Sequence, residues 1–435
     1  MAERFPRYAL YAFIVGLPFH NVVVAELWEL GIRGLPLDVV SAWKEVLLAV
    51  ALGVVVWTRR GIPFKSTSTD WLALAFAAFV VVYAVIPQDW LGGNASGRGI
   101  LYGLRHGLTP VAAYVLGRSL HLGRNDLRRV GALILGTAAV VAAWGLIDVY
   151  AIPLDGWRNS GAPGWFSEQL GLDYGRAVSG LPENFVYNPG DERPLRRLVS
   201  TFLSPLATGY LLLVALLVAA AWGRSRWLSA LSGLLLVGLL FTYSRTSIAA
   251  LALALGVLAY ALRSWWPLAA ATVLVVTGFF FVNAYPEIGP ETSFTPAELE
   301  FQRANAQQEP EASGDPTSFD EPSFDSHLDS LREGIGTVAH HPQGFGLGNA
   351  GVTAKRTGEE IKAGESTYTE LGVEVGLLGM LVFLAWNLAL LRRVLPRAPW
   401  LGAALVAVLA LGIQTDVIGV HWLAFVLWTL AGERA

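Results

Sequence analysis

Arginine residues beside or within apolar runs are the first candidates for chemistry in this sequence. Arg245 lies in the short stretch Tyr243–Ser247 between two such runs, and Arg196 and Arg197 come shortly before a third. Arg105 lies inside a run, where a charge costs about 2.5–3.5 kcal/mol and needs a reason. A guanidinium is permanently charged and presents paired donors that match phosphate oxygens. Each arginine also has an interpretation other than phosphate binding. Arg245 would extend to the membrane interface, Arg196 and Arg197 would form a surface pair, and Arg105 would pair with a buried acidic residue.

Groups that can accept a proton follow later in the chain. Glu365 comes just before a long apolar run, with Tyr368 three residues further on. His340 and His341 come directly before a glycine-rich stretch, and His327 lies upstream of them. A carboxylate or an imidazole can remove a proton from an attacking hydroxyl if it lies within hydrogen-bond reach. For Glu365, an acid that stabilises a helix N-terminus is an equally good interpretation.

The composition indicates what kind of scaffold positions these residues. The chain has 435 residues, of which 54% are hydrophobic and 15% are charged, whereas soluble proteins are roughly 25% charged. Many apolar runs approach the ~20 residues needed to cross a bilayer. These features exclude the soluble globular classes and indicate a polytopic membrane protein. The chain contains no cysteine, so a disulfide framework is excluded as well.

The apolar runs predict an all-α bundle of about twelve transmembrane helices in a single membrane domain covering residues 1–435. We expect these helices at residues 8–25, 37–58, 70–87, 99–117, 128–150, 200–222, 227–243, 247–263, 265–284, 367–391, 398–415 and 417–432.

The distribution of charge predicts the orientation of this bundle. With the N-terminus inside, the inner segments hold 16 of the 31 basic residues, as the positive-inside rule requires. Two long segments, 152–199 and 286–366, then fall outside. The second carries 15 acidic and five basic residues between Glu287 and Glu365. We therefore expect both termini in the cytoplasm and the active site at the outer face, with part of it in the large outer loop before the tenth helix.

Three sequence motifs follow one another along the chain in the order found in one known superfamily. They are RLVSTFLSPLATGYL at 197–211, TYSRTS at 242–247, and HPQGFGLG at 341–348 followed by ESTYTELGVEVGLLG at 365–379. They resemble the Arg-x-x-Gly-x-Phe-x-x-Pro-Asn helix start, the Ser-Arg-Gly turn, and the Pro-x-Gly-x-Gly loop with its His-Asn-x-Tyr-Leu sequence, all found in one superfamily. That superfamily comprises the O-antigen ligases and O-antigen polymerases, which are bacterial membrane glycosyltransferases.

The resemblance implies a GT-C-like fold in the bacterial cytoplasmic membrane. It also implies transfer of a glycan from an undecaprenyl-pyrophosphate carrier to an acceptor on the outer face. The two arginines that grip the pyrophosphate in the family fall on Arg197 and Arg245. The family's histidine falls on Glu365, with Ser366 at the neighbouring asparagine, which leaves a carboxylate where a base is needed.

These observations lead to a set of expected roles. We expect Arg245, Arg197, Arg196 and Arg105 to bind pyrophosphate, Glu365 to be the base with His341 and His340 as rivals, and Tyr368 and His327 to contact the acceptor sugar. His327 is also a third histidine candidate for the base. No metal-ligand spacing occurs, so we expect metal-independent, inverting transfer without a cofactor. The expected partners are the lipid-linked donor, a glycan or lipid-linked acceptor and membrane lipids, but no nucleic acid.

Several functions remain open at this point. A polysaccharide polymerase is favoured over a ligase that joins glycan to lipid A–core or another surface acceptor, because the His-Asn pair is missing. A transporter or flippase of the same lipid-linked glycan would also need arginines above an apolar groove. A non-catalytic scaffold in envelope assembly is a further alternative, and it predicts that the arginines are dispensable.

Overall fold

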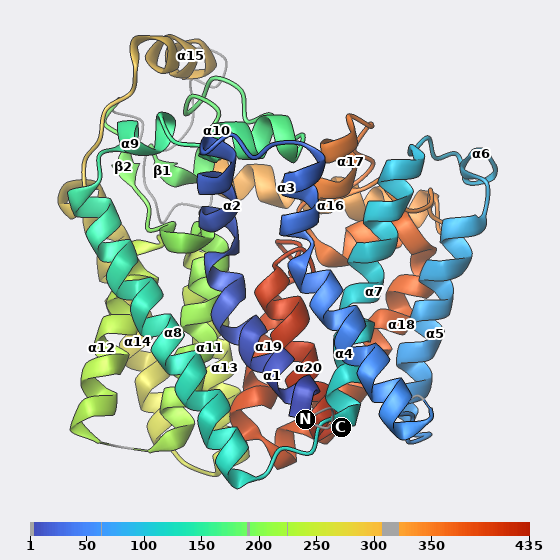
Figure 1. Cartoon of the computed structure of the whole chain (residues 1–435). Coiled ribbons are helices and arrows are strands. Elements are labelled where there is room, and N and C mark those ends of the chain that lie inside the picture. The colour runs from blue at the N-terminus through green and yellow to red at the C-terminus, as the bar shows by residue number, and fades with distance from the viewer. Residues whose placement is uncertain (1–3, 62, 189–191, 224, 307–321) are drawn as a thin grey trace.

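The computed structural model describes residues 4–61, 63–188, 192–223, 225–306 and 322–435 (Figure 1). Helices make up nearly all of its regular structure. In the described residues, the only strands are β1 (Val186–Tyr187) and β2 (Leu195–Arg196), which pair antiparallel. The predicted all-α class is therefore confirmed.

Every helix expected from the apolar runs coincides with helical structure. The elements are α1 (Phe5–Gly16), η2 (Leu17–Phe19) and α2 (His20–Glu29); α3 (Leu35–Ser41) and α4 (Trp43–Arg59); α5 (Ser68–Val85); α7 (Gly97–Ser119); α8 (Arg124–Ala151); α11 (Pro205–Trp222); α12 (Arg226–Phe241); α13 (Arg245–Leu262); α14 (Trp266–Ile288); α18 (Thr367–Arg397); α19 (Pro399–Leu411); and η6 (Leu423–Leu427) with α20 (Trp428–Arg434).

Fewer helices than predicted meet both the length and the composition criteria for a membrane span. Among the described residues, seven helical segments are long and apolar enough to cross a bilayer, and the bent pair α3–α4 makes an eighth. Helices α12 and α19 have only 16 and 13 residues, short of the ~20 that a full crossing needs. Helix α7 is long enough but carries Arg98, Arg105 and His106. The predicted count of twelve spans is therefore not confirmed.

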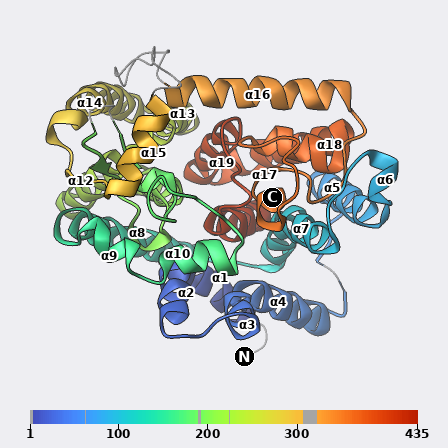
Figure 2. The same cartoon turned by 90° about the horizontal axis from the view of Figure 1, so that it is seen from above.

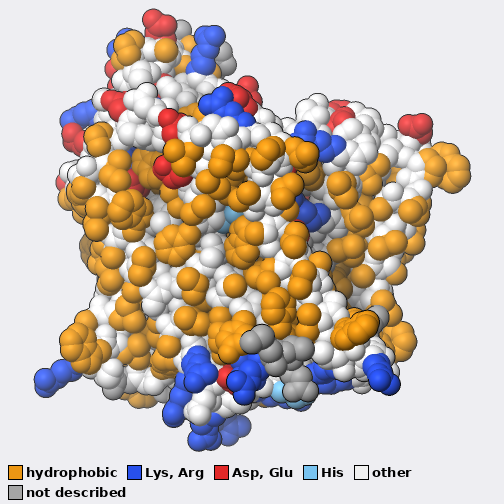
Figure 3. All heavy atoms as spheres, viewed as in Figure 1, with side chains coloured by type: hydrophobic (Ala, Val, Ile, Leu, Met, Phe, Trp, Pro, Cys, Tyr) orange, Lys and Arg blue, Asp and Glu red, His pale blue; other side chains and the backbone are white. Residues whose placement is uncertain are grey.

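Charged side chains separate toward the two ends of the bundle. Lysine and arginine side chains gather at the end where both termini lie, which we call the basic end (Figures 1 and 3). Acidic side chains lie mostly at the opposite end, the loop end, and hydrophobic side chains cover the surface between them (Figure 3). This is the pattern that the positive-inside rule leads one to expect for a membrane protein.

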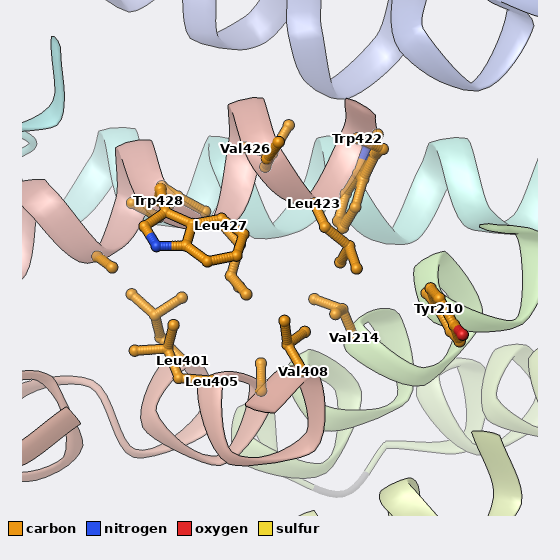
Figure 4. Close-up of a cluster of buried hydrophobic side chains, with 14 of the residues drawn as sticks. Tyr210, Val214, Leu401, Leu405, Val408, Trp422, Leu423, Val426, Leu427 and Trp428 are labelled. Carbon is orange, nitrogen blue, oxygen red and sulfur yellow. The ribbon is translucent and has the colours of Figure 1, made fainter. Parts of the chain in front are cut away.

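The bundle is held together by a continuous apolar core. Figure 4 shows part of it, where Val214 of α11 lies near Val408 of α19 and Leu423 of η6. These side chains are at most 1% exposed. Close packing between helices of this kind is what drives association in lipid, where a hydrophobic driving force between helices is missing.

Both long segments fold at the loop end (Figure 1). Segment 152–199 forms α9 (Leu154–Arg158), α10 (Ala162–Gly164), η3 (Trp165–Gln169), η4 (Glu183–Phe185) and the two strands. Segment 286–366 contributes α15 (Pro296–Ala306), α16 (Pro322–His340) and α17 (Gly351–Thr357). Two further short helical elements are α6 (Gln88–Leu91) and η5 (Ser200–Phe202).

The two segments are joined by a buried ion pair. Arg158 of α9 binds Glu298 of α15 at 2.5 Å, and the two side chains are 6% and 1% exposed. Segment 152–199 also has its own apolar cluster, in which Trp157 and Phe185 pack with Val24 of α2. Figure 2 shows α16 lying across the loop end, from near α13 and α14 to α18. The loop end is thus a folded layer above the bundle.

Candidate functional site

A tight turn between α12 and α13 positions Arg245 at the loop end. Helix α12 ends at Phe241, and Ser244 caps α13 by accepting a hydrogen bond from the Ser247 N–H at 3.3 Å. Tyr243 adopts a left-handed φ of 50°, which turns the chain back within three residues. Arg245 is therefore the first residue of α13 and is only half-buried.

Arg197 binds this same turn. Its Nε donates to the Thr242 carbonyl at 3.0 Å, and its Nη2 donates to the Tyr243 carbonyl at 3.4 Å. The next residue, Leu198, donates its N–H to the Phe241 carbonyl at 2.9 Å. The segment that follows β2 thus docks on the end of α12. The structure brings Arg197 to the turn that carries Arg245, although the two residues are 48 positions apart in the sequence.

Arg196 is directed elsewhere. Neighbouring side chains in extended backbone point to opposite sides, and the Arg196 side chain is buried with Asp148 of α8. Its Nη2 lies 3.2 Å from the Asp148 carboxylate, and its Nη1 donates to the Ile152 carbonyl at 2.8 Å. Asp148 also accepts from the Trp157 indole at 2.7 Å. Arg196 thus ties segment 152–199 to the bundle, apart from the turn at Arg245.

We expect Asp148→Asn to destabilise the protein. The change leaves the Arg196 charge buried without its counter-charge, and breaking a buried pair typically costs about 3–5 kcal/mol. Thermal unfolding in detergent should show a clearly lower midpoint. Asp155→Asn is the matched control, because Asp155 also pairs with an arginine but its side chain is 68% exposed, so that its pair contributes at most about 1 kcal/mol. Equal midpoints for the two variants would contradict this role of Arg196.

Glu365 lies just outside α18 and contacts a histidine from α16. It has a left-handed φ of 65°, and α18 begins two residues later at Thr367. Its Oε2 lies 2.5 Å from Nδ1 of His327. The two side chains are 46% and 44% exposed, so the pair is open to the loop end. A carboxylate held by an imidazole in this way can accept a proton from a bound hydroxyl.

The other two histidine candidates lie at the far end of α16. His340 ends that helix 13 residues after His327, a separation of roughly 20 Å at 1.5 Å per residue. Nδ1 of His340 lies 2.8 Å from the Gly336 carbonyl. His341 is stacked on Phe345 and lies 2.8 Å from the Leu91 carbonyl. The structure therefore separates His340 and His341 from the Glu365–His327 pair.

The comparison with known proteins supports the resemblance found in the sequence. Residues 230–384 match the family model described as O-antigen ligase. This part of the chain is similar to the O-antigen ligases. The match runs from α12 into α18, so it includes Arg245, His327 and Glu365 but leaves Arg197 and Arg105 outside. No curated protein matches the chain.

Within the segment that matches the O-antigen ligases, the start of α18 is anchored to α19. The Ser366 hydroxyl donates to the Gly412 carbonyl at 3.1 Å, and the Thr367 hydroxyl donates to the Thr415 carbonyl at 2.9 Å. Helix α19 packs along α13, and it runs toward the loop end, where α13 begins at Arg245 (Figure 1). This packing holds Glu365 at the same end of the α13–α19 pair as Arg245.

The glycine-rich loop of the matched segment is part of the scaffold. Helix α18 is interrupted at Gly376, where φ is 72° and ψ is 167°. Loop residues fill the break, because Phe345 donates its N–H to the Val373 carbonyl at 2.6 Å and Pro342 accepts from the Leu377 N–H at 2.8 Å. Three glycines of this loop have positive φ, namely Gly344, Gly346 and Gly348, as does Gly351 at the start of α17. Their conformational freedom serves this docking.

We expect Gly376→Ala to lower the thermal stability markedly. A residue other than glycine is strained by about 1–3 kcal/mol in this backbone region, and a Cβ atom would lie 2.8 Å from the Tyr83 hydroxyl. Gly336→Ala in α16 is the control, since a Cβ there meets no atom within 4 Å and alanine favours a helix by about 0.5–1 kcal/mol. The docking role of Gly376 is wrong if both variants unfold at the wild-type temperature.

The two remaining candidates have other contacts. Tyr368 donates its hydroxyl to the Leu409 carbonyl at 2.7 Å and packs between α18 and α19. Arg105 of α7 lies 3.6 Å from Glu45 of α4. Its ring contact is with Tyr102 of the same helix. Of the candidate residues, the structure therefore brings Arg197 to the turn that carries Arg245 and brings His327 to Glu365.

Proposed function

We propose that the protein transfers a glycan from an undecaprenyl-pyrophosphate-linked donor to an acceptor hydroxyl, as a polysaccharide polymerase of the O-antigen type. The observation that carries this proposal is the docking of Arg197 on the turn that presents Arg245. Two guanidinium groups from distant segments at one turn match the oxygens of a pyrophosphate. The match of residues 230–384 to the O-antigen ligase family supports the same reaction class.

The proposed orientation places the basic end in the cytoplasm and the loop end outside the inner membrane. Both termini then face the cytoplasm, and segments 152–199 and 286–366 form the outer face of a single membrane domain. The charge separation in Figure 3 supports this orientation. The lipid tail of the donor would lie in the bilayer, while its pyrophosphate meets the arginines at the interface.

The chemistry follows from these positions. The acceptor oxygen attacks the anomeric carbon, a new carbon–oxygen bond forms, and the bond from that carbon to the pyrophosphate breaks. Arg197 and Arg245 stabilise the charge that develops on the leaving pyrophosphate. Glu365 takes the hydroxyl proton, and His327 holds the carboxylate in place. Attack opposite the leaving group inverts the anomeric centre, and no step calls on a metal ion or a cofactor.

The ligase is the second candidate, because the family that the chain matches is described by that activity. The polymerase is preferred because the family's histidine is replaced by Glu365. Purified protein mixed with lipid-linked repeat units alone distinguishes the two functions. Longer carrier-bound chains are expected from a polymerase. Product that forms only after a different surface acceptor is added would overturn the polymerase proposal in favour of the ligase.

A further inference from the structure

A second group of arginines lies at the loop end, around the ring of Tyr102 in α7. The guanidinium carbons of Arg98, Arg105 and Arg356 lie 5.3, 5.4 and 4.2 Å from the centre of this ring. Arg98 also donates to the Tyr102 hydroxyl at 2.7 Å. We call these four residues the Tyr102 cluster.

The local fold explains why three arginines meet here. Positions 98, 102 and 105 are four and three residues apart, so they share one face of α7. Arg356 comes from α17, which packs on α7, and the loop that leads into α17 approaches α7 closely at Gly103. A Cβ atom on Gly103 would lie 2.9 Å from the Gly348 N–H nitrogen. Arg356 is fixed further by its hydrogen bond to the Leu170 carbonyl at 3.0 Å.

The negative charge around this cluster is smaller than its positive charge. Glu45 lies 3.6 Å from Arg105, but it is shared with the buried Lys44, which is also 3.6 Å away. Asp38 adds a weaker interaction with Arg356, and its carboxylate already accepts a hydrogen bond from Gln169.

Arg356 shows how crowded these cations are. Burial lowers the pKa of its guanidinium, the Tyr102 hydroxyl opposes this change, and the like charges of Arg105 and Arg98 lower the pKa further. An arginine remains protonated even so. The ring of Tyr102 attracts cations by about 0.5–2 kcal/mol, but it carries no charge that could neutralise three guanidinium groups.

We propose that the Tyr102 cluster binds a second phosphate or pyrophosphate, carried by the acceptor. This inference rests on the proposed function, in which the donor pyrophosphate occupies Arg197 and Arg245. A polymerase acceptor is a second carrier-linked repeat, and a ligase acceptor is a phosphorylated surface lipid. Both present the same anionic group to the fork-shaped donors of arginine.

The location of the cluster supports an acceptor subsite. The backbone of α17 is tied to the segment that leads into Glu365, through the Gly351 N–H and the Ala363 carbonyl at 2.8 Å. His106 of α7 lies 3.0 Å from Asp416, next to the residue that anchors the start of α18. In Figure 2, α7 and α17 lie on one side of α19 and α13 lies on the other. The two residues that follow Glu365 bond to the segment directly after α19, through Ser366 to Gly412 and Thr367 to Thr415.

Binding of farnesyl pyrophosphate to the full-length protein in phosphatidylcholine nanodiscs tests this inference. The wild type should bind two molecules per chain. Arg98→Gln combined with Arg356→Gln should bind one, and so should Arg197→Ala combined with Arg245→Ala. Lys355→Gln is the control, because it removes the same charge from an exposed neighbour on α17 and should leave both sites intact.

Each alternative has its own result. One site in the wild type, or two sites in the Arg98/Arg356 variant, would overturn the acceptor subsite. Loss of one site in the Arg98/Arg356 variant but none in the Arg197/Arg245 variant would refute the proposed donor site while the second anion site stands. If phosphatidylglycerol in the nanodisc abolishes one of the wild-type sites, a membrane lipid is the occupant and the acceptor assignment is wrong.

A kinetic measurement separates binding from a structural role. At saturating donor, the Arg98/Arg356 variant should raise the KM for the acceptor at least about tenfold with kcat nearly unchanged, as expected when uniform binding is lost. A fall of kcat in the Arg98/Arg356 variant, with the KM for the acceptor unaltered, would contradict a binding role for the cluster.

Discussion

Replacing Arg245 by lysine is expected to reduce glycan transfer by roughly 10²–10³-fold, the loss seen when one fixed donor to a developing negative charge is removed. Lysine keeps the charge but is a point donor, so the two-pronged contact with phosphate oxygens is lost. Initial rates of transfer with purified protein and lipid-linked donor would measure the effect. Because the first residue of a helix tolerates both side chains, the fold should be unaffected.

Arg263→Lys is the matched control for this variant. Arg263 caps the other end of α13 in a left-handed conformation and is exposed, so it lies at the basic end, away from the proposed site. Its replacement should leave transfer within about twofold of the wild type, as is usual for a surface change. Near-normal turnover in Arg245→Lys, at wild-type thermal stability, would remove Arg245 from the site.

Glu365→Gln is expected to reduce transfer by about 10²–10⁴-fold, the usual contribution of a general base. An amide has almost the same shape and still contacts His327, but it cannot accept the proton. Donor binding should survive, because the arginines that hold the pyrophosphate are unchanged. Transfer rates and equilibrium binding of a carrier-pyrophosphate mimic would separate the two effects.

Glu360→Gln serves as the control, since Glu360 lies in the same segment, exposed and paired with Lys362. His341→Ala should also retain most of the activity, because His341 lies at the far end of α16. If Glu365→Gln stays active while His341→Ala is inactive, the base belongs to the histidine loop and the present assignment of Glu365 is wrong.

The positions of the helices were largely predictable because apolar run length and helix formation are linked in lipid, where backbone groups must bond internally. The number of spans was harder to predict. Helix α12 is only 16 residues long, and α7 interrupts its apolar surface with Arg98 and Arg105. A pattern of apolar residues marks such helices without showing whether they cross the bilayer.

The residues of the candidate site could be named from the sequence, but their contacts could not be predicted. Arg197 and Arg245 were both expected from the resemblance, but their meeting depends on the docking of the chain after β2 on α12. Arg196 could not be separated from Arg197 by residue type, because only the alternation of side chains in extended backbone directs it to Asp148. These are effects of backbone direction rather than of sequence spacing.

The contacts made by the two long loop-end segments could not be predicted from the sequence. His327 and Glu365 are 38 residues apart, and no helical or strand spacing joins them. The length of α16 decides which histidine reaches Glu365, since it carries His340 away from that carboxylate. The Tyr102 cluster likewise needs Arg356 of α17, and only the spacing of Arg98 and Arg105 on α7 was a signal of it in the sequence.

The most direct test of the central claim measures two products of one reaction in proteoliposomes that contain purified protein, lipid-linked donor and acceptor. The proposed reaction predicts that undecaprenyl pyrophosphate is released in step with each new glycosidic bond. It also predicts that Arg197→Ala combined with Arg245→Ala stops both. Movement of the donor across the bilayer without release of the carrier, at the same rate in this double variant, would contradict the account and identify a transporter instead.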